Sequence, residues 1–156
     1  MTEEYPSRWA NTLTYSEWIQ LVIADELPPP PIAALIGFRL VRAERGTAVV
    51  EFQATSRHAN PMGTLHGGVI CDIADAAMGC ALGSTLPSGE SCTTIELKAN
   101  FFKPVWEARL TAAARIVRKT RTLCFLECDV RDERRHLIAR LSRTCSILRG
   151  ESARGR

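Results

Sequence analysis

The sequence predicts an α+β domain in which a curved antiparallel sheet wraps around one long buried helix. First, the stretch from Gly68 to Ser84 carries only two charged residues, Asp72 and Asp75, and a helix that is apolar nearly all round is buried. Second, strand-like segments flank this stretch on both sides and are joined by short turns. Third, 156 residues suffice for one core but not for two. One helix layer packed on one sheet layer satisfies all three observations.

The N-terminal part is predicted to be helical and separate from the sheet. Residues 15–27 place Trp18, Leu21 and Val22 at helical spacing, and the four prolines at 28–31 prevent the helix from continuing. Residues 32–36 form a helical turn that Gly37 ends. We therefore expect an N-terminal helical extension over residues 1–36, a main domain over 37–149 and a flexible tail over 150–156.

A hairpin and the buried helix come next. Residues 38–43 and 47–54 read as two strands around the turn Glu44-Arg45-Gly46. A polar loop over residues 58–66 leads into the helix, and Pro87, Ser88 and Gly89 break the chain after it.

Four further strands are predicted at residues 93–102, 109–118, 122–131 and 137–148. The first alternates Ile95, Leu97, Ala99 and Phe101 against a polar face that includes Thr94. The third directs Cys124, Leu126, Cys128 and Val130 to one side. The last places Arg143 on its apolar side, a position that the sequence leaves unexplained.

The helix needs a cover on both sides, whereas a sheet covers only one. A helical wheel gives Val69, Ile73, Ala77 and Cys80 as the strongest apolar stripe, with Asp75 roughly opposite. Around Asp75 lie further apolar or small residues, namely Met78, Gly79 and Leu82. A second copy of the chain is the economical cover for that side, so we expect a homo-oligomer.

Composition excludes several classes of function. A net charge of +3 with 24% charged residues does not give the concentrated basic face of a nucleic-acid-binding protein. No apolar run approaches the roughly 20 residues that span a bilayer, and the polar N-terminus is no secretory signal. We expect a cytoplasmic protein with its six cysteines as free thiols and without a metal, since its three histidines lack a ligand arrangement.

The polar loop and the helix share one spaced motif. It consists of Asn60, Gly63, His66, Gly67 and Gly68, followed by Asp75 seven residues after the second glycine of the pair. This pattern resembles the active-site segment of hotdog-fold acyl-CoA thioesterases, in particular the PaaI-type (phenylacetate-pathway) group, and the resemblance extends over about residues 38–148.

The resemblance implies a hotdog fold and hydrolysis of an acyl-CoA to the free acid and CoA, with no cofactor besides the coenzyme A of the substrate. In such enzymes two chains pair, and each active site combines the helix acid of one chain with the His-Gly turn of the other. Relatives are commonly dimers of dimers, so we expect a homodimer or homotetramer.

The resemblance also assigns roles. Asp75 is the base or the nucleophile. Poor solvation raises the basicity of such a carboxylate. The Gly67 amide at the positive helix N-terminus polarises the carbonyl. His66, Asn60 and Thr94 assist, and Asp72 has no place in the motif. Residues expected to contact the substrate are Gly63, Gly68 and, for the CoA phosphates, Lys103, Arg118, Lys119 and Arg121.

Two other functions stay open on the same fold. One is a hydratase or dehydratase of hydroxyacyl- or enoyl-CoA, and the other is a non-catalytic acyl-CoA-binding module. The acyl group is not specified either: aryl-acetyl, hydroxybenzoyl and medium-chain fatty acyl groups all remain candidates.

Overall fold

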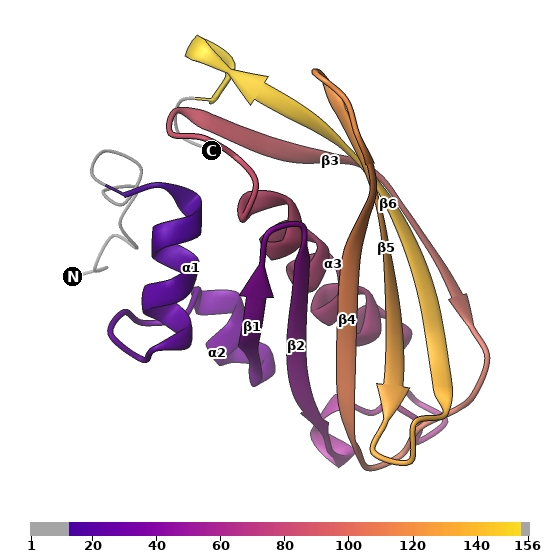
Figure 1. The fold of residues 1–156 in the computed structure, drawn as a ribbon. Coiled ribbons are helices and arrows are strands. Elements are labelled where there is room, and N and C mark those ends of the chain that lie inside the picture. Colours follow the sequence, from indigo (N-terminus) through magenta and orange to yellow (C-terminus); the bar gives the residue numbers. More distant parts are fainter. Residues whose placement is uncertain (1–12, 154–156) are drawn as a thin grey trace.

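The computed structural model describes residues 13–153, and its centre is a single six-stranded antiparallel sheet (Figure 1). The order in space is β1-β2-β4-β5-β6-β3. The strands are β1 (Phe38–Glu44), β2 (Thr47–Ala54), β3 (Glu90–Phe101), β4 (Ala108–Lys119), β5 (Leu123–Asp132) and β6 (Leu137–Arg149). All six match predicted strands, with ends that differ by up to three residues.

The long helix α3 (Gly67–Gly83) packs against the sheet, which curves around it (Figure 1). The predicted hotdog architecture is thereby confirmed. The helical wheel was only partly right, because Met78 and Leu82 are fully buried in the core whereas Val69 and Cys80 are only partly buried. The buried face of α3 consists of Ile70, Ile73, Ala74, Ala77, Met78, Ala81, Leu82 and Gly83.

Two short helices precede the sheet. Helix α1 (Tyr15–Ile23) begins at a capping box in which Thr14 and Glu17 satisfy each other's backbone amides. It ends four residues before the predicted end at Leu27, because Asp25 adopts a left-handed φ of 57° and the amides of Glu26 and Leu27 turn back to the Leu21 carbonyl. Helix α2 (Pro31–Ile36) ends at Gly37, whose φ of 90° suits glycine.

These two helices lie on the side of α3 that faces away from the sheet. The Tyr15 ring packs directly on Gly83, where a Cβ atom would overlap the ring. The chain's own N-terminal helices therefore cover part of the face for which the sequence suggested only a second copy as the cover. The need for a cover on this side of α3 therefore no longer requires a second copy of the chain, and the homo-oligomer stays a prediction.

Strand β3 forms one edge of the sheet and contains a bulge. Its pairing with β6 shifts between Thr94 and Glu96, so Ile95 is the extra residue and is 60% exposed. The prediction that Ile95 lies on the same face of the strand as Leu97 was therefore wrong. The large apolar side chains of this edge and the following loop that remain exposed are Ile95, Phe101, Phe102 and Trp106.

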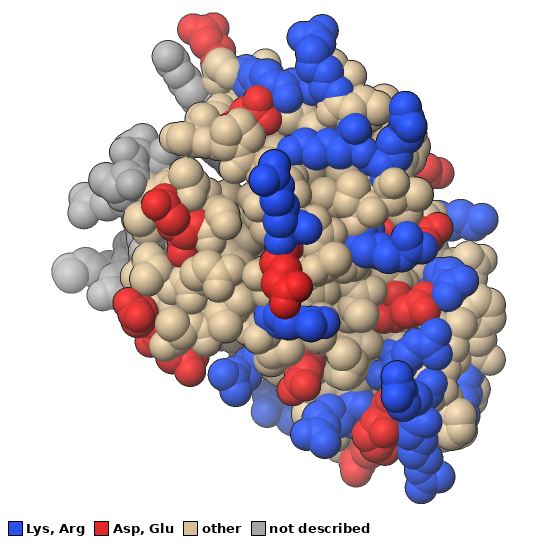
Figure 2. Space-filling view, viewed as in Figure 1, with Lys and Arg blue, Asp and Glu red and all other residues tan. Residues whose placement is uncertain are grey.

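The burial of side chains, the free cysteines and the charges on the surface agree with a small domain that has one core. The inner side chains of β5 are buried as predicted, and all six cysteines are free thiols. Acidic and basic side chains are interspersed over the face shown in Figure 2. Several acidic and basic side chains of the protein form ion pairs, for example Arg140 with Asp129. Within residues 13–153, no helix has the length and apolar character needed to cross a membrane.

We predict that Gly83→Ala destabilises the fold. Alanine favours a helix over glycine by about 1 kcal/mol, but its methyl group would overlap the Tyr15 ring, and overpacking costs about 1–3 kcal/mol. Chemical denaturation should therefore show a lower free energy of unfolding. The double variant Tyr15→Ala/Gly83→Ala should melt no lower than Tyr15→Ala alone, and a further drop would contradict this explanation.

Candidate active site

The loop before α3 is held by its own side chains. Asn60 accepts hydrogen bonds from the amides of Met62 and Thr64 through Oδ1 and donates from Nδ2 to the Thr64 hydroxyl. Gly63 has a φ of 80°, which glycine adopts without strain, and closes this turn. Both motif residues thus shape the loop, and the polar atoms of Asn60 are engaged inside it.

The His-Gly-Gly turn starts α3 and leaves one amide available. His66 is the N-cap, and its Nδ1 accepts a hydrogen bond from the Gly68 amide at 2.9 Å. In the neutral ring the proton therefore sits on Nε2. The Gly67 amide lies in the first helical turn, and none of the described residues accepts a hydrogen bond from it. A Cβ on Gly67 would lie 3.2 Å from the Phe101 ring, so glycine permits this close packing.

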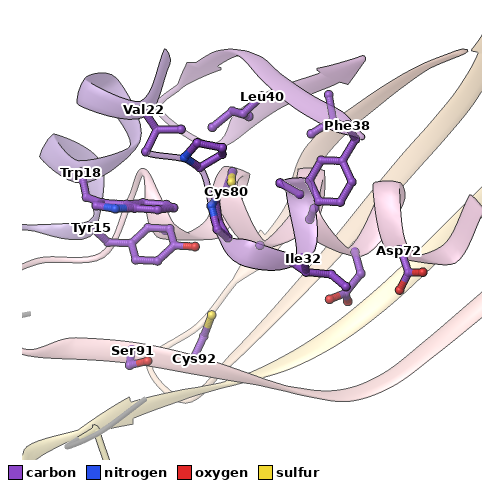
Figure 3. A pocket seen from close by; sticks show the side chains of 18 of the residues that line it. Tyr15, Trp18, Val22, Ile32, Phe38, Leu40, Asp72, Cys80, Ser91 and Cys92 are labelled. Carbon is purple, nitrogen blue, oxygen red and sulfur yellow. The ribbon is translucent and has the colours of Figure 1, made fainter. Parts of the chain in front are cut away.

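Asp75 lies two turns further along α3 and lines a cavity of about 410 Å³. The wall opposite α3 consists largely of the N-terminal helices and β1, and Figure 3 shows Tyr15, Trp18 and Ile32 facing Ser91 and Cys92 of β3. The lining is mostly apolar and has the volume of a small-molecule site. The apolar wall from the N-terminal extension is a component that the sequence did not predict.

A second component that the sequence did not predict is Arg143 of β6. Its Nη1 atom lies 3.3 Å from Asp75 Oδ1 and donates a hydrogen bond of 2.8 Å to the Asp75 carbonyl. The side chain is only 6% exposed and also lines the cavity. The sequence did show an arginine within an apolar row of a strand, but no local pattern identifies its partner, which lies 68 residues away.

The groups around Asp75 have altered acidities. Desolvation raises the pKa of Asp72, and the nearby Asp75 charge raises it further. Burial raises the pKa of the Cys80 thiol to about 12. A hydrogen bond with the Cys145 thiol lowers the pKa of Cys92 to about 7, with Arg143 adding to the effect. The cavity thus keeps Cys80 protonated at neutral pH and makes Cys92 its more acidic thiol.

Thr94 faces the helix side of the sheet and not the outer side that the predicted alternation gave it. It pairs directly with Cys145, which is completely buried, and residues opposite each other in an antiparallel pair share one face. Its side chain is exposed, so it lies at the uncovered part of that face.

The predicted phosphate-binding residues do not come together in one chain. Lys103 lies before β4, where it contacts His136 and Asp132, and Arg118, Lys119 and Arg121 lie at the other end of this strand. Twelve residues of strand span roughly 40 Å. Lys119 is also committed to the Thr85 carbonyl and hydroxyl beyond the end of α3. Lys103 therefore lies apart from the other three residues within one subunit, and the assignment of all four to the CoA phosphates stays a prediction.

The site as a whole offers a carboxylate beside an apolar cavity and a free amide at a helix N-terminus. These two groups stand eight residues apart on the same helix, which corresponds to about 12 Å along its axis. The amide must lie about 3 Å from the carbonyl oxygen, and the carboxylate must lie about as close to the carbonyl carbon, or one water molecule further away if it acts as a base, so one copy of α3 does not bring both groups to one carbonyl. As for metals, no group of three or more His, Cys, Asp or Glu residues suited to bind one occurs in the described part of the chain.

Comparisons with known proteins identify the family of this chain. Residues 62–139 match the model of the thioesterase superfamily, a stretch that includes His66, Gly67 and Asp75. The 1,4-dihydroxy-2-naphthoyl-CoA hydrolase of Listeria monocytogenes is 30% identical over 112 residues, which cover 72% of this chain and 89% of that protein.

Solved structures point the same way. A variant of the phenylacetic acid degradation protein PaaI from Thermus thermophilus superposes with a TM-score of 0.70 at 25% identity, covering 75% of this chain and 98% of that one. The PaaI protein of E. coli shares the fold with a TM-score of 0.76 at 19% identity, covering 87% and 97% of the two chains. The hotdog fold, the spaced His-Gly-Gly and Asp75 motif and these matches together show that the chain belongs to the thioesterase superfamily.

Proposed function

We propose that this protein hydrolyses acyl-CoA thioesters, with Asp75 as the base or nucleophile. The observation that carries the proposal is the position of the Asp75 carboxylate on the wall of an apolar cavity of about 410 Å³. Such a cavity accepts an aryl or medium-chain acyl group and excludes water from it. Hydrolase activity on an aryl-CoA is named for the Listeria relative, which adds weight to this substrate class.

The chemistry follows from the two groups of the site. With Asp75 as base, its carboxylate takes a proton from water while the water oxygen adds to the thioester carbonyl carbon. The Gly67 amide stabilises the charge that develops on the carbonyl oxygen. The C–S bond then breaks, CoA leaves as its thiolate and takes up a proton, and the free acid remains. With Asp75 as nucleophile, its oxygen attacks the carbonyl carbon, the C–S bond breaks, and CoA leaves as its thiolate and takes up a proton; water then cleaves the resulting mixed anhydride, which releases the free acid and restores the Asp75 carboxylate.

Because Gly67 and Asp75 are about 12 Å apart on one helix, the proposal requires a second copy of the chain. The free edge of β3 offers a surface for it, since unpaired backbone groups and four exposed large apolar side chains lie along or beside this edge. A two-fold pair of chains would contain two identical sites, each with Asp75 from one chain and Gly67 from the other.

We predict that Asp75→Ala lowers kcat by a factor on the order of 10² to 10⁴, because the reaction loses its base or nucleophile. Purified wild type and variant are incubated with aryl- and medium-chain acyl-CoAs, and CoA is measured by chromatography, since the protein's own thiols react with thiol reagents. The matched control Asp72→Asn, on the same face of α3, should stay within a few-fold of wild type.

Three outcomes of this assay would reject the proposal. Turnover by Asp75→Ala at the wild-type rate removes Asp75 from the reaction. Tight acyl-CoA binding without CoA release across the panel identifies a binding module. Loss of water from a hydroxyacyl-CoA without CoA release identifies a dehydratase.

We predict that Gly67→Pro lowers kcat by a factor on the order of 10² to 10³, because it deletes the amide proton. Proline suits the first helical position, and the extended backbone of His66 (ψ 129°) is what a following proline requires. Gly67→Ala keeps the amide proton and adds the same contact with Phe101, so it should retain most of the activity.

The two inactive variants also test whether each site is shared between chains. After unfolding and refolding together, Asp75→Ala and Gly67→Pro chains should regain about a quarter of wild-type turnover, because half of the dimers are mixed and each mixed dimer has one intact site. A mixture that stays inactive would mean that the two groups do not meet across an interface.

We also predict that light scattering gives a mass of at least two chains at micromolar concentration. Ile95→Lys places a charge on the β3 edge and should shift the mass toward one chain while lowering turnover. A wild-type mass equal to one chain would contradict the shared site.

A further inference from the structure

Arg143 is an unusual residue for the interior of this protein. It belongs to the inward-facing row of β6, between the fully buried Leu141 and Cys145. Among the described residues it is the only charged residue that is buried. Removing a guanidinium from water costs free energy that only good partners return. The partners of Arg143 therefore indicate its role.

The hydrogen bond and the ion pair of its side chain both go to Asp75. Nη1 donates to the Asp75 carbonyl at 2.8 Å and lies 3.3 Å from Asp75 Oδ1. That carbonyl belongs to the interior of α3, where the amide four residues later is its regular partner, so Arg143 uses its second lone pair. A Cβ on Gly79 would lie 3.3 Å from Nη1, so the glycine one turn after Asp75 leaves the space that the guanidinium occupies.

The pairing is incomplete, which argues against a role in stability. Arg143 Nε and Asp75 Oδ1 are both buried and have no hydrogen-bond partner among the described residues. A structural arginine usually binds a carboxylate through two parallel hydrogen bonds. Here one nitrogen instead spans the backbone and the side chain of the same residue. The contact fixes where Asp75 stands more than it stabilises the fold.

We propose that Arg143 is the positioning residue of Asp75. It holds the middle of α3 through the Asp75 carbonyl and limits the rotamers of the carboxylate, so that Oδ2 is directed to the reacting carbonyl. The proposal rests on the proposed function of Asp75. Although Arg143 lines the cavity, its proposed role is exerted through Asp75, so its loss affects kcat much more than KM.

The test compares Arg143→Met with Arg143→Lys and with the matched control Arg140→Met. Methionine keeps the length of the side chain without its charge, and Arg140 lies on the same strand but is exposed and paired with Asp129. Arg143→Met should lower kcat by a factor on the order of 10 to 100, as small misplacements of a reacting group do, with KM within about two-fold. Arg143→Lys should recover part of kcat, and Arg140→Met should match wild type.

Thermal unfolding separates positioning from support of the fold. Replacing a buried, poorly paired charge by an apolar side chain is often neutral or stabilising, so Arg143→Met should have an unchanged or higher Tm although it turns over more slowly. Wild-type kcat in Arg143→Met, or a kcat loss accompanied by a lower Tm and absent at lower temperature, would overturn the proposal.

A crystal structure of Arg143→Met tests the same proposal without any activity. Asp75 should occupy several rotamers or a shifted one, and an unchanged rotamer would overturn the positioning role. If the wild type releases no CoA from any substrate, the proposed function fails, and this structural comparison still decides whether Arg143 positions Asp75.

Discussion

The rigid rise of an α-helix is the constraint on which the site depends. Helix α3 carries both the free Gly67 amide and the Asp75 carboxylate, and it is fixed by a face of completely buried side chains against the sheet. Because the helix cannot bend to bring these groups together, their separation of about 12 Å is a property of the fold and not of one conformation. Any reaction that uses both must join two copies of the chain.

Small residues on α3 allow other elements to approach its backbone. Gly83 receives the Tyr15 ring, Gly79 leaves room for Arg143, and Gly67 contacts Phe101. Each approach brings a different segment to the helix: the N-terminal extension, strand β6 and the end of β3. The price in helix propensity is moderate, at about 1 kcal/mol for each glycine relative to alanine. In return the face around Asp75 becomes a lined cavity within a single chain.

Local pattern was enough to predict most of the fold and half of the site. The period-two burial of Cys124, Leu126, Cys128 and Val130 and the apolar run of α3 identified the sheet and the central helix, because burial on one face repeats along the chain. The fixed spacing from His66 to Asp75 located the candidate reacting groups. The sequence did not predict features that depend on the backbone conformation of one residue, such as the left-handed φ of Asp25 and the bulge at Ile95. Contacts between distant segments were also not predicted, above all the contact of Arg143 with Asp75, because no local pattern encodes a partner 68 residues away.

Part of the cavity wall comes from outside the stretch of the chain that carries the motif. Residues 62–139, which match the superfamily model, contain Gly67 and Asp75, whereas Trp18, Ile32 and Phe38 come from the first fifty residues. Under the proposed function, part of the surface that selects the acyl group is thus encoded apart from the reacting groups. Recombination or directed evolution confined to the first fifty codons can reshape the acyl chamber without altering the hydrolytic groups.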